Sequence, residues 1–419
     1  MKKIVIAGAG FGGIKAFQLL SKYLRLGEEA ELTLLNDTNY FLFTPLLHEV
    51  ATGSLSPENI VVPLAPLAAG KGQRFIPAKV LKVLSAENKV LTDKGDIPYD
   101  YLILGLGSEV NYYNTPGTDK YVYSLKDLDD AARIKNKIIS QFEKAACLKT
   151  ASERRQALTF VIVGAGATGV ELSGELADFC KFTFKKLYGP ALVNNARIVV
   201  VQKEGHILPQ FSDGLRHRSL ATLGRKGVEV MINTGVKQVE EGKVILDTGE
   251  VILSDTIIWS AGVKPHQVDI TPPLKLERDK VVVESSLMTS IPNIFALGDM
   301  VLFIDAKTKT PLPMLAQVAD RQAKVVAKNV VRAVRGKPLK NFTYRSQGSL
   351  VSLGGWWAVG EVLGLHFAGR LAWVLWRGVY WSKMPTLSKK LQIGLDWILN
   401  AFRPRDVALL PFTKKNIHQ

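Results

Sequence analysis

Two short apolar runs, each followed at once by a glycine-rich turn, are the clearest features in the pattern of hydrophobic and polar positions. Residues 4–6 (Ile-Val-Ile) precede the turn at residues 8–13, and residues 161–163 (Val-Ile-Val) precede the turn at residues 164–169. An unbroken apolar run is typical of a strand that is buried on both faces of a parallel sheet. We therefore predict a strand, a tight turn and a helix at both places.

The two turns are part of an internal repeat. They lie 156 positions apart (164 − 8), residues 89–96 resemble residues 243–250 at an offset of 154 (243 − 89), and residues 100–107 resemble residues 255–262 at an offset of 155 (255 − 100). Three matched segments at nearly one offset indicate a duplicated dinucleotide-binding unit. Two dinucleotides on one chain suggest electron transfer between them.

Strands and helices alternate through both copies of the repeat. After the second copy, a strand at residues 280–283 and a helix from Met314 resume the first copy, so the second unit is inserted in the first. Alternating strands and helices predict a parallel sheet that is covered on both faces. We therefore predict an α/β protein with two Rossmann-like dinucleotide-binding domains.

The glycines of the first turn predict a phosphate cradle. Glycine lets the chain turn tightly and lets the backbone N–H groups at a helix start approach a pyrophosphate. The glycines of this cradle are Gly8, Gly10, Gly12 and Gly13. The next strand ends in Asn36 and Asp37, where an acid is expected to hold ribose hydroxyls. Either Asn36 or an inward-turned Asp37 can bind the ribose. The alternative for Asp37 is a solvated position in a loop.

A later segment, residues 289–299, ends in Gly298 and Asp299. A carboxylate at a strand end beside a helix start can accept a hydrogen bond from a polyol hydroxyl; the alternative role of Asp299 is a helix cap. This segment resembles the second FAD fingerprint of two-dinucleotide flavoproteins, in which the aspartate meets the ribitol. The resemblance implies that the first turn holds FAD and the second turn holds a nicotinamide nucleotide.

The second turn offers the same cradle through Gly164, Gly166 and Gly169, and the strand that follows its helix ends in Gln202-Lys203-Glu204. A glutamate at this strand end would grip both ribose hydroxyls and repel a 2′-phosphate. Gln202 removes the repulsion and Lys203 adds a positive charge, so we predict that NADPH is accepted as well as, or instead of, NADH. In the alternative, Glu204 reaches round and preserves selectivity for NADH.

Three segments together resemble the type II NADH dehydrogenases, which are single-chain, non-pumping NADH:quinone oxidoreductases. They are residues 44–53 (TPLLHEVATG), 164–176 (GAGATGVELSGEL) and 313–322 (PMLAQVADRQ), and the resemblance extends from about residue 3 to 405. It implies FAD held without a covalent bond, hydride transfer from a nicotinamide, and two electrons passed to a membrane quinone. By the same resemblance, Gln317 matches the glutamine at the quinone end of the flavin, and Glu171 matches the glutamate that relays protons.

Quinone reduction also consumes protons, which Glu171 or His48 could deliver. A carboxylic acid buried near a flavin has a raised pKa and is a credible donor. His48 could instead pack in the core, Gln317 could be a surface amide, and Glu175 could be a solvated carboxylate favoured by the helix dipole. The predicted cofactor-binding residues are Gly8, Gly10, Gly12, Gly13, Asn36, Asp37, Thr44, Gly107, Gly164, Gly166, Thr168, Gly169, Gln202, Gly262, Gly298, Asp299, Ala316 and Gln317.

The predicted domains follow from these assignments. Residues 1–115 and 266–340 form the two parts of the FAD-binding domain, 116–155 a connecting helix, 156–265 the NAD(P)H-binding domain, and 341–419 a C-terminal amphipathic helical membrane-contact region.

Composition narrows the partners. The net charge of +16 calls for an anionic partner, but no basic run with interleaved aromatic residues resembles a nucleic-acid module, so we expect no nucleic acid. The two cysteines, Cys147 and Cys180, are too few for a disulfide framework or a metal cage, which favours a reducing compartment. They also lack the pairing that disulfide reductases and sulfide:quinone oxidoreductases need, so we expect both to be buried bystanders. We expect no signal peptide and no single membrane-spanning helix.

The C-terminal region carries apolar stripes at helical spacing. One stripe is Leu387, Leu391, Leu395, Ile398 and Phe402, and a second is Phe367, Leu371, Val374, Leu375 and Gly378. Apolar stripes with basic residues and tryptophans beside them are typical of helices that lie in the headgroup layer of an anionic membrane. We therefore expect a peripheral protein on the cytoplasmic side of the cell membrane. Packing on the protein's own core and a homodimer interface are the alternatives, and a soluble ferredoxin or rubredoxin reductase is the alternative function.

Overall fold

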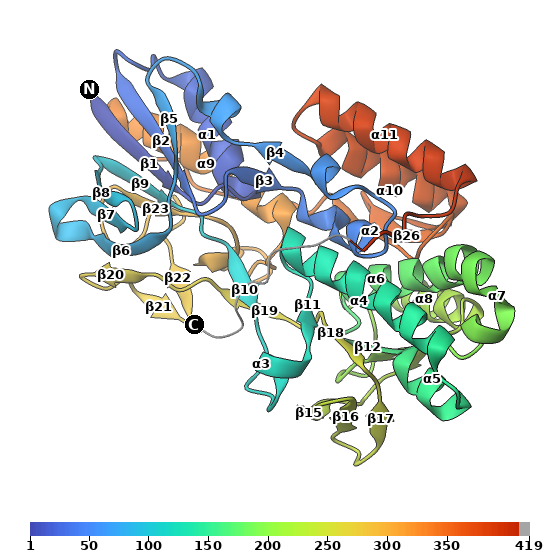
Figure 1. Cartoon of the computed structure of the whole chain (residues 1–419). Helices are drawn as coiled ribbons and strands as arrows, with labels where there is room; N and C mark the ends of the chain where they lie inside the picture. Colours follow the sequence, from blue (N-terminus) through green and yellow to red (C-terminus); the bar gives the residue numbers. More distant parts are fainter. Residues whose placement is uncertain (410–419) are drawn as a thin grey trace. The chain divides into compact units, whose positions relative to one another are not determined.

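The computed structural model describes residues 1–409, which form two compact units (Figure 1). Unit 1 comprises residues 1–41, 62–109 and 263–345, and unit 2 comprises residues 42–61, 110–262 and the chain from 346 onward. The second dinucleotide repeat is thus inserted within the first along the chain, as predicted. Residues 42–61, which are predicted to belong to the first domain, form part of unit 2. Short strands mark the passages between the units: β3 (Tyr40–Leu42), β4 (Val61–Pro63), β10 (Ser108–Val110) and β19 (Val263–Pro265).

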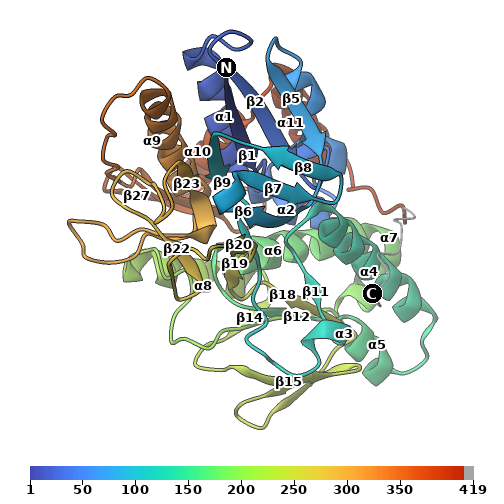
Figure 2. The same ribbon diagram turned by 90° about the vertical axis from the view of Figure 1, so that its left-hand side faces the viewer.

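Unit 1 is built on a five-stranded parallel sheet with the strand order β23-β9-β1-β2-β5. Its strands are β1 (Lys2–Ala7), β2 (Ala30–Asn36), β5 (Gln73–Pro77), β9 (Tyr101–Leu104) and β23 (Ile294–Ala296). Residues 4–7 and 101–104 are all buried, which explains why these strands have unbroken apolar sequences. The helices α1 (Phe11–Tyr23) and α9 (Ala316–Val334) pack against each other beside this sheet (Figure 2).

Smaller elements complete unit 1. The strands β6 (Val80–Leu84), β7 (Lys89–Thr92), β8 (Gly95–Pro98) and β20 (Asp269–Thr271) form one sheet, and β21 (Leu276–Glu277), β22 (Lys280–Val282) and β24 (Val301–Leu302) form another. The short 3-10 helices are η3 (Ala65–Ala68), η4 (Ser85–Glu87) and η6 (Gly298–Met300). The helix expected from Met314 begins at Ala316, because Leu315 before it is extended.

Unit 2 repeats the same plan. Its parallel sheet has the order β11-β18-β12-β13-β14, with β11 (Tyr123–Ser124), β12 (Thr159–Val163), β13 (Arg197–Val201), β14 (Val228–Met231) and β18 (Thr256–Trp259). In both units the strand before the glycine turn lies between the second strand of the repeat and a strand from its end (β9-β1-β2 and β18-β12-β13). The repeat seen in the sequence is therefore also a repeat of topology.

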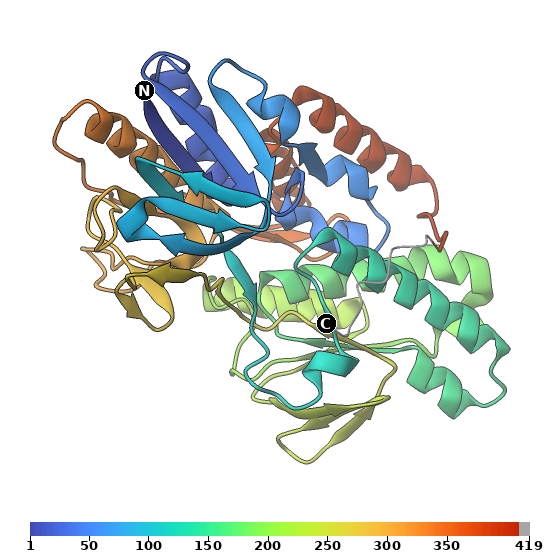
Figure 3. The same cartoon turned by 60° about the vertical axis from the view of Figure 1, so that its left-hand side comes forward.

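Helices and a three-stranded antiparallel sheet complete the dinucleotide fold of unit 2. They are α3 (Thr118–Tyr121), α4 (Leu128–Cys147), α5 (Ala151–Ala157), α6 (Ala167–Asp178), the π-helical turn η5 (Phe179–Phe184), α7 (Lys185–Val193) and α8 (Asp213–Arg225), with the antiparallel strands β15 (Val236–Glu240), β16 (Lys243–Leu246) and β17 (Val251–Leu253) (Figure 3). The N-terminal segment of the unit adds η1 (Thr44–Leu46), α2 (Leu47–Ala51) and η2 (Pro57–Ile60). Cys180 is buried in η5, but Cys147 is exposed because it ends α4, so the expectation that both are buried is wrong for Cys147.

The C-terminal part of unit 2 contains strands as well as helices. The antiparallel strands β25 (Gly348–Ser352), β26 (Ala358–Val362) and β27 (Leu365–Gly369) precede α10 (Arg370–Lys383) and α11 (Leu387–Phe402), which contact each other. Phe367 therefore belongs to a strand, and the predicted second helical stripe begins only after it. The reason is a two-residue hairpin turn at Leu363 and Gly364, both with positive φ (53° and 84°), which pairs Val362 with Leu365. None of the helices within residues 1–409 has the length and hydropathy needed to cross a membrane.

Candidate functional site

The glycine turn of unit 1 is shaped by close backbone packing. Gly8 has φ of +103°, and a Cβ on it would lie 2.3 Å from the carbonyl oxygen of Gly105. A Cβ on Gly13 would lie 1.9 Å from the carbonyl oxygen of Gly8, and one on Gly12 would lie 2.3 Å from Leu297 Cδ1. Gly8 and Gly13 meet backbone atoms and are therefore required by the fold itself, whereas Gly12 meets only the end of a leucine side chain.

Gly10 differs from its neighbours. No described atom lies within 4 Å of the place where its Cβ would be, although Gly10 is the residue that starts α1. The first turn of α1 carries no acidic side chain, and no side chain within residues 1–409 caps it. The open space at Gly10 and the N–H groups of this helix start fit the approach of a pyrophosphate.

The turn of unit 2 has the same division of roles. Gly164 has φ of +100° and packs against Ala261, and a Cβ on Gly169 would lie 1.9 Å from the carbonyl oxygen of Gly164. Gly166, at the start of α6, again has no described atom within 4 Å of its Cβ position. Both turns therefore fit a dinucleotide, and in each the glycine that the fold does not need is the one beside the helix start.

An amide side chain closes each turn from the next strand. In unit 1 the Asn36 side-chain oxygen accepts a hydrogen bond of 2.8 Å from the Ala9 N–H. In unit 2 the Gln202 side-chain oxygen accepts a hydrogen bond of 2.6 Å from the Ala165 N–H. Of the two residues considered for the first ribose, Asn36 contacts the glycine turn, whereas Asp37 is exposed.

The second FAD fingerprint converges on the same end of unit 1. Asp299 accepts a hydrogen bond of 2.6 Å from the Ser108 hydroxyl, next to Gly107, and Gly298 donates one of 2.7 Å to the Gln322 side chain. Gln322 belongs to α9, whose first turn contains Ala316 and Gln317. The Gly12 packing against Leu297 brings the start of α1 to this place as well. Unit 1 thus brings together the glycine turn, Asp299 and the start of α9.

Glu171 and His48 meet in the interior of unit 2. His48 Nδ1 of α2 lies 3.7 Å from Glu171 Oε2 of α6, and both side chains are almost fully buried. The other carboxylate oxygen of Glu171 accepts hydrogen bonds from the Ser352 N–H (3.2 Å) and from Trp376 Nε1 (3.1 Å). His48 Nε2 is buried and has no hydrogen-bond partner within residues 1–409. Two titratable side chains therefore lie within 4 Å of each other in the interior of unit 2, and one of them has a buried polar atom without a partner among the described residues.

Burial is the main influence on the Glu171 carboxyl. It raises the pKa of Glu171 to about 7, even though His48 and the two hydrogen bonds favour the ionised form. Near neutral pH this carboxyl is therefore poised to take up or release a proton.

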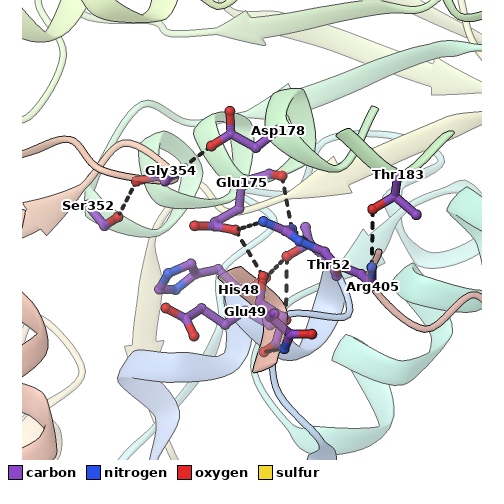
Figure 4. Close-up of polar contacts among 12 residues, drawn as sticks. His48, Glu49, Thr52, Glu175, Asp178, Thr183, Ser352, Gly354 and Arg405 are labelled. Carbon is purple, nitrogen blue, oxygen red and sulfur yellow. Dashed lines mark hydrogen bonds and ion pairs between the residues drawn. The ribbon is translucent and has the colours of Figure 1, made fainter. Parts of the chain in front are cut away.

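Glu175 lies one helical turn after Glu171 and is held very differently. Figure 4 shows Glu175 beside Arg405. Its carboxylate forms a buried ion pair of 2.6 Å with Arg405 and accepts a hydrogen bond of 3.1 Å from the Ser54 hydroxyl. Burial alone would raise the pKa of Glu175, but Arg405, helped by His48 and Arg377, lowers it to about 2. Glu175 is thus a permanently charged, buried carboxylate, and the expectation of a solvated one is wrong.

Glu49 is the third buried acid of this cluster. Its carboxylate accepts a hydrogen bond of 2.8 Å from Trp397 Nε1 of α11 and lies 3.6 Å from Arg377 of α10. The Arg377 guanidinium lies over the rings of Trp373 (4.4 Å) and Trp397 (4.2 Å). Burial raises the pKa of the Glu49 carboxyl, and Arg377 opposes the shift. This arrangement ties the C-terminal helices to the segment that carries His48.

The positions of Thr44, Thr168 and Gly262 give less information about a ligand. Thr44 and Thr168 are exposed at the starts of η1 and α6, both in unit 2. Gly262 has φ of +74° and faces the Tyr113 ring. Sequence reasoning missed Arg405, Arg377, Trp376 and Ser352, which hold the buried acids. The only signal in the sequence was that charged and indole side chains interrupt apolar stripes.

Comparison with known proteins agrees with this geometry. Residues 2–323 match the pyridine nucleotide-disulphide oxidoreductase family. The chain belongs to this class of two-dinucleotide oxidoreductases. Residues 346–406 match the NDH2 C-terminal domain.

Two curated relatives and one solved structure narrow the class. The chain is 31% identical over 375 residues to the type II NADH:quinone oxidoreductase of Staphylococcus saprophyticus, covering 88% of this chain and 92% of that protein. It is 29% identical over 419 residues to a probable NADH dehydrogenase of Dictyostelium discoideum, covering 97% and 91%. The structure of NDH2 from Plasmodium falciparum in complex with NADH superposes with a TM-score of 0.89 at 21% identity, covering 97% and 99%.

The chain therefore belongs to the type II NADH:quinone oxidoreductases. The predicted family, the α/β fold with two dinucleotide-binding units and the oxidoreductase class are confirmed.

Proposed function

We propose that this protein oxidises NADH, holds FAD without a covalent bond and reduces a quinone, without pumping protons. The observation that carries the proposal is membership of the type II NADH:quinone oxidoreductases over nearly the whole chain. It is supported by the two glycine turns, each with an unfilled space beside a helix start. FAD, when bound, supplies the redox chemistry that the side chains lack, because it accepts a hydride and passes electrons on.

The residues of the chain have separate tasks in this proposal. Gly10, Asn36 and Asp299 hold FAD in unit 1. In unit 2, Gly166 makes room for the nicotinamide nucleotide, and the Gln202 side chain bonds to the glycine turn beside it. Gln317, in the first turn of α9, hydrogen-bonds the quinone or the flavin edge. The prediction that NADPH is accepted assumed that Gln202 faces the ribose. The hydrogen bond from Gln202 to Glu204 supports the alternative, in which Glu204 preserves selectivity for NADH.

Proton balance gives Glu171 and His48 their role. NADH and quinone become NAD+ and hydroquinone with the net uptake of one proton per turnover. A carboxyl with a pKa of about 7 exchanges protons at neutral pH, so Glu171 supplies a proton and His48, 3.7 Å away, replaces it. The unpartnered Nε2 of His48 supports this role, because a buried polar atom needs a water or substrate as its partner.

Steady-state turnover of the FAD-loaded protein tests the proposal. With NADH as donor, we expect a short-chain quinone to reoxidise the flavin much faster than oxygen does. Glu171→Gln should slow quinone reduction and flatten its pH profile near pH 7. A protein that reduces a ferredoxin or rubredoxin but no quinone would instead support the soluble alternative.

We also propose that α11 docks on the anionic surface of the cytoplasmic side of the cell membrane. Its leucine stripe faces outward, with Leu387, Leu391, Leu395 and Ile398 exposed to 70%, 64%, 56% and 61%. Inward-facing Ile393 is fully buried, and Asp396 accepts a hydrogen bond of 2.6 Å from Asn59. A helix that buries polar side chains and exposes leucines needs an apolar partner outside the chain.

Liposome binding tests this surface. Leu391→Glu with Leu395→Glu should abolish partition onto phosphatidylglycerol vesicles, while the control Gln392→Glu, on an exposed position of the same helix, should leave most of it. Loss of a dimer in ultracentrifugation without loss of vesicle binding would assign the stripe to a homodimer interface instead. Deleting residues 386–419 without effect on vesicle binding would exclude α11 as the anchor.

A further inference from the structure

The two units share one hydrogen-bond arrangement at the glycine turn. In each, the amide side chain at the end of the second strand accepts a hydrogen bond from the residue after the first glycine, Ala9 or Ala165. In each, the NH2 group of the same amide then donates to a residue two positions further on. Asn36 donates to the hydroxyl (2.8 Å) and the carbonyl (3.0 Å) of Thr38, and Gln202 donates to the carboxylate of Glu204.

These hydrogen bonds determine which side chain is available to a ligand at the end of the second strand. Gln202 is buried and uses both polar atoms of its side chain within the protein. Glu204 is exposed, and its carboxylate is fixed to the glycine turn through this one amide. In dinucleotide-binding folds, the ribose of the adenosine lies at this strand end. A neutral Thr38 occupies the corresponding position in unit 1.

Lys203, the cation between Gln202 and Glu204 in the sequence, has a different neighbour. The aliphatic part of Lys203 lies beside Gly235, since a Cβ on that glycine would be 3.7 Å from Lys203 Cγ. At the same place the Asp247 carboxylate accepts a hydrogen bond of 2.9 Å from the Gly235 N–H. Lys203 therefore has an acid for a near neighbour, whereas Glu204 is joined to the turn.

We propose that Glu204, positioned by Gln202, is the residue that selects NADH over NADPH. The inference rests on the proposed function, in which unit 2 holds the nicotinamide nucleotide. The Glu204 carboxylate accepts hydrogen bonds from the ribose hydroxyls and repels a 2′-phosphate, which is the task otherwise performed by an acid at position 202. The negative charge therefore lies two residues after the usual position, and the Gln202 amide holds it there.

Equilibrium titration of the FAD-loaded protein with NAD+ and NADP+ tests the proposal without depending on turnover. The variants are Glu204→Gln, Gln202→Glu and the matched control Glu241→Gln, an exposed glutamate of the same unit. We expect the unchanged protein to bind NAD+ at least about tenfold more tightly than NADP+. Glu204→Gln should reduce this ratio by about tenfold. Gln202→Glu should reduce it by a smaller factor, because a carboxylate cannot donate the hydrogen bond that holds Glu204, while Glu241→Gln should leave it within about threefold.

Two results would overturn the proposal. One is a ratio that Glu204→Gln leaves unchanged, and the other is a tenfold rise in NAD+ preference on Gln202→Glu, which would mean that position 202 itself faces the ribose. Because Glu204 is exposed, retention of bound FAD confirms that each variant is folded. Failure of the proposed function would be seen separately, as a protein that binds NAD+ selectively but reduces no quinone.

Discussion

Glu171 shows how one side chain acquires its chemistry from three different elements. Its carboxylate is contacted by His48 of α2, Ser352 of β25 and Trp376 of α10, and burial outweighs all three in setting a pKa of about 7. An acid whose pKa is raised on folding contributes its full stability below the unfolded pKa, near 4.5. That contribution is lost as the pH rises through the folded pKa.

Glu171→Gln is therefore expected to stabilise the protein at alkaline pH but not at acid pH. A neutral amide avoids burying a charge, so its advantage over glutamate grows between about pH 4.5 and pH 7, to about 3 kcal/mol. Urea unfolding at pH 5 and pH 8.5 measures this difference. The exposed Glu250→Gln is the control and should show no such trend; an equal advantage at both pH values would mean that Glu171 is not titrating in this range.

Glu175 responds in the opposite direction, because its pKa is lowered to about 2 by Arg405. Its contribution to stability is present above about pH 4.5 and is lost as the pH falls toward 2. Arg405→Met leaves this carboxylate buried without its partner, which should cost about 3–5 kcal/mol at pH 7. The control is Arg403→Met, at an exposed position two residues earlier. Equal melting temperatures for the two variants at pH 7 would show that the ion pair contributes little.

At the scale of elements, the strand–turn–helix units separate glycines needed for folding from glycines needed for ligand. The backbone packing around Gly169 leaves no room for a Cβ, while the space at Gly166 is open. The sequence identified both glycines as one motif. It could not separate them, because the distinction depends on which atoms of distant segments approach each turn.

We expect Gly166→Val to fold normally, since its φ of −69° and ψ of −175° suit a β-branched residue. It should retain FAD but bind NAD+ at least about tenfold more weakly, because the side chain fills the space for the pyrophosphate. Gly169→Ala should instead lower the free energy of unfolding by about 1–3 kcal/mol, because the new Cβ meets the Gly164 carbonyl. Calorimetric titration and thermal melting separate the two effects; unimpaired NAD+ binding by Gly166→Val would count against the cradle.

The helix α11 was only partly predictable. Its spacing of four, four and three residues from Leu387 to Ile398 predicts a helical stripe from sequence alone. The direction of that stripe was not predictable, since Trp397 and Asn400 bond inward to Glu49 and to the Ser54 carbonyl and so turn the leucines outward. The strands β25 to β27 were missed because the hairpin turn at Leu363 and Gly364 lacks the usual Asn-Gly or Asp-Gly signal.

For the whole molecule, two forces should act together at a membrane surface: the net charge of +16 and the exposed leucine stripe. Salt shortens the range of the charge interaction from about 10 Å at 0.1 M to about 3 Å at 1 M but leaves apolar contacts in place.

Binding to anionic vesicles should therefore weaken between 0.1 M and 1 M salt without disappearing. The Leu391→Glu and Leu395→Glu double variant should lose binding at both salt concentrations. Vesicle co-sedimentation measures both effects, with uncharged phosphatidylcholine vesicles as the control. Complete release of the unchanged protein at 1 M salt would mean that charge alone holds it.

The sequence by itself determined the duplication, the buried parallel strands, the two glycine turns and the family. These features follow from short-range steric needs and from the periods of strand and helix, which a linear pattern records directly. Only the tertiary structure decided which acid titrates near neutral pH and which holds a fixed charge. Glu171 and Glu175 are four positions apart, yet one has a pKa of about 7 and the other of about 2. Burial dominates at Glu171, whereas Arg405 reaches Glu175 from a distant part of the chain. Burial and nearby charges set the pKa of a buried carboxyl, and the spacing of residues along the chain predicts neither.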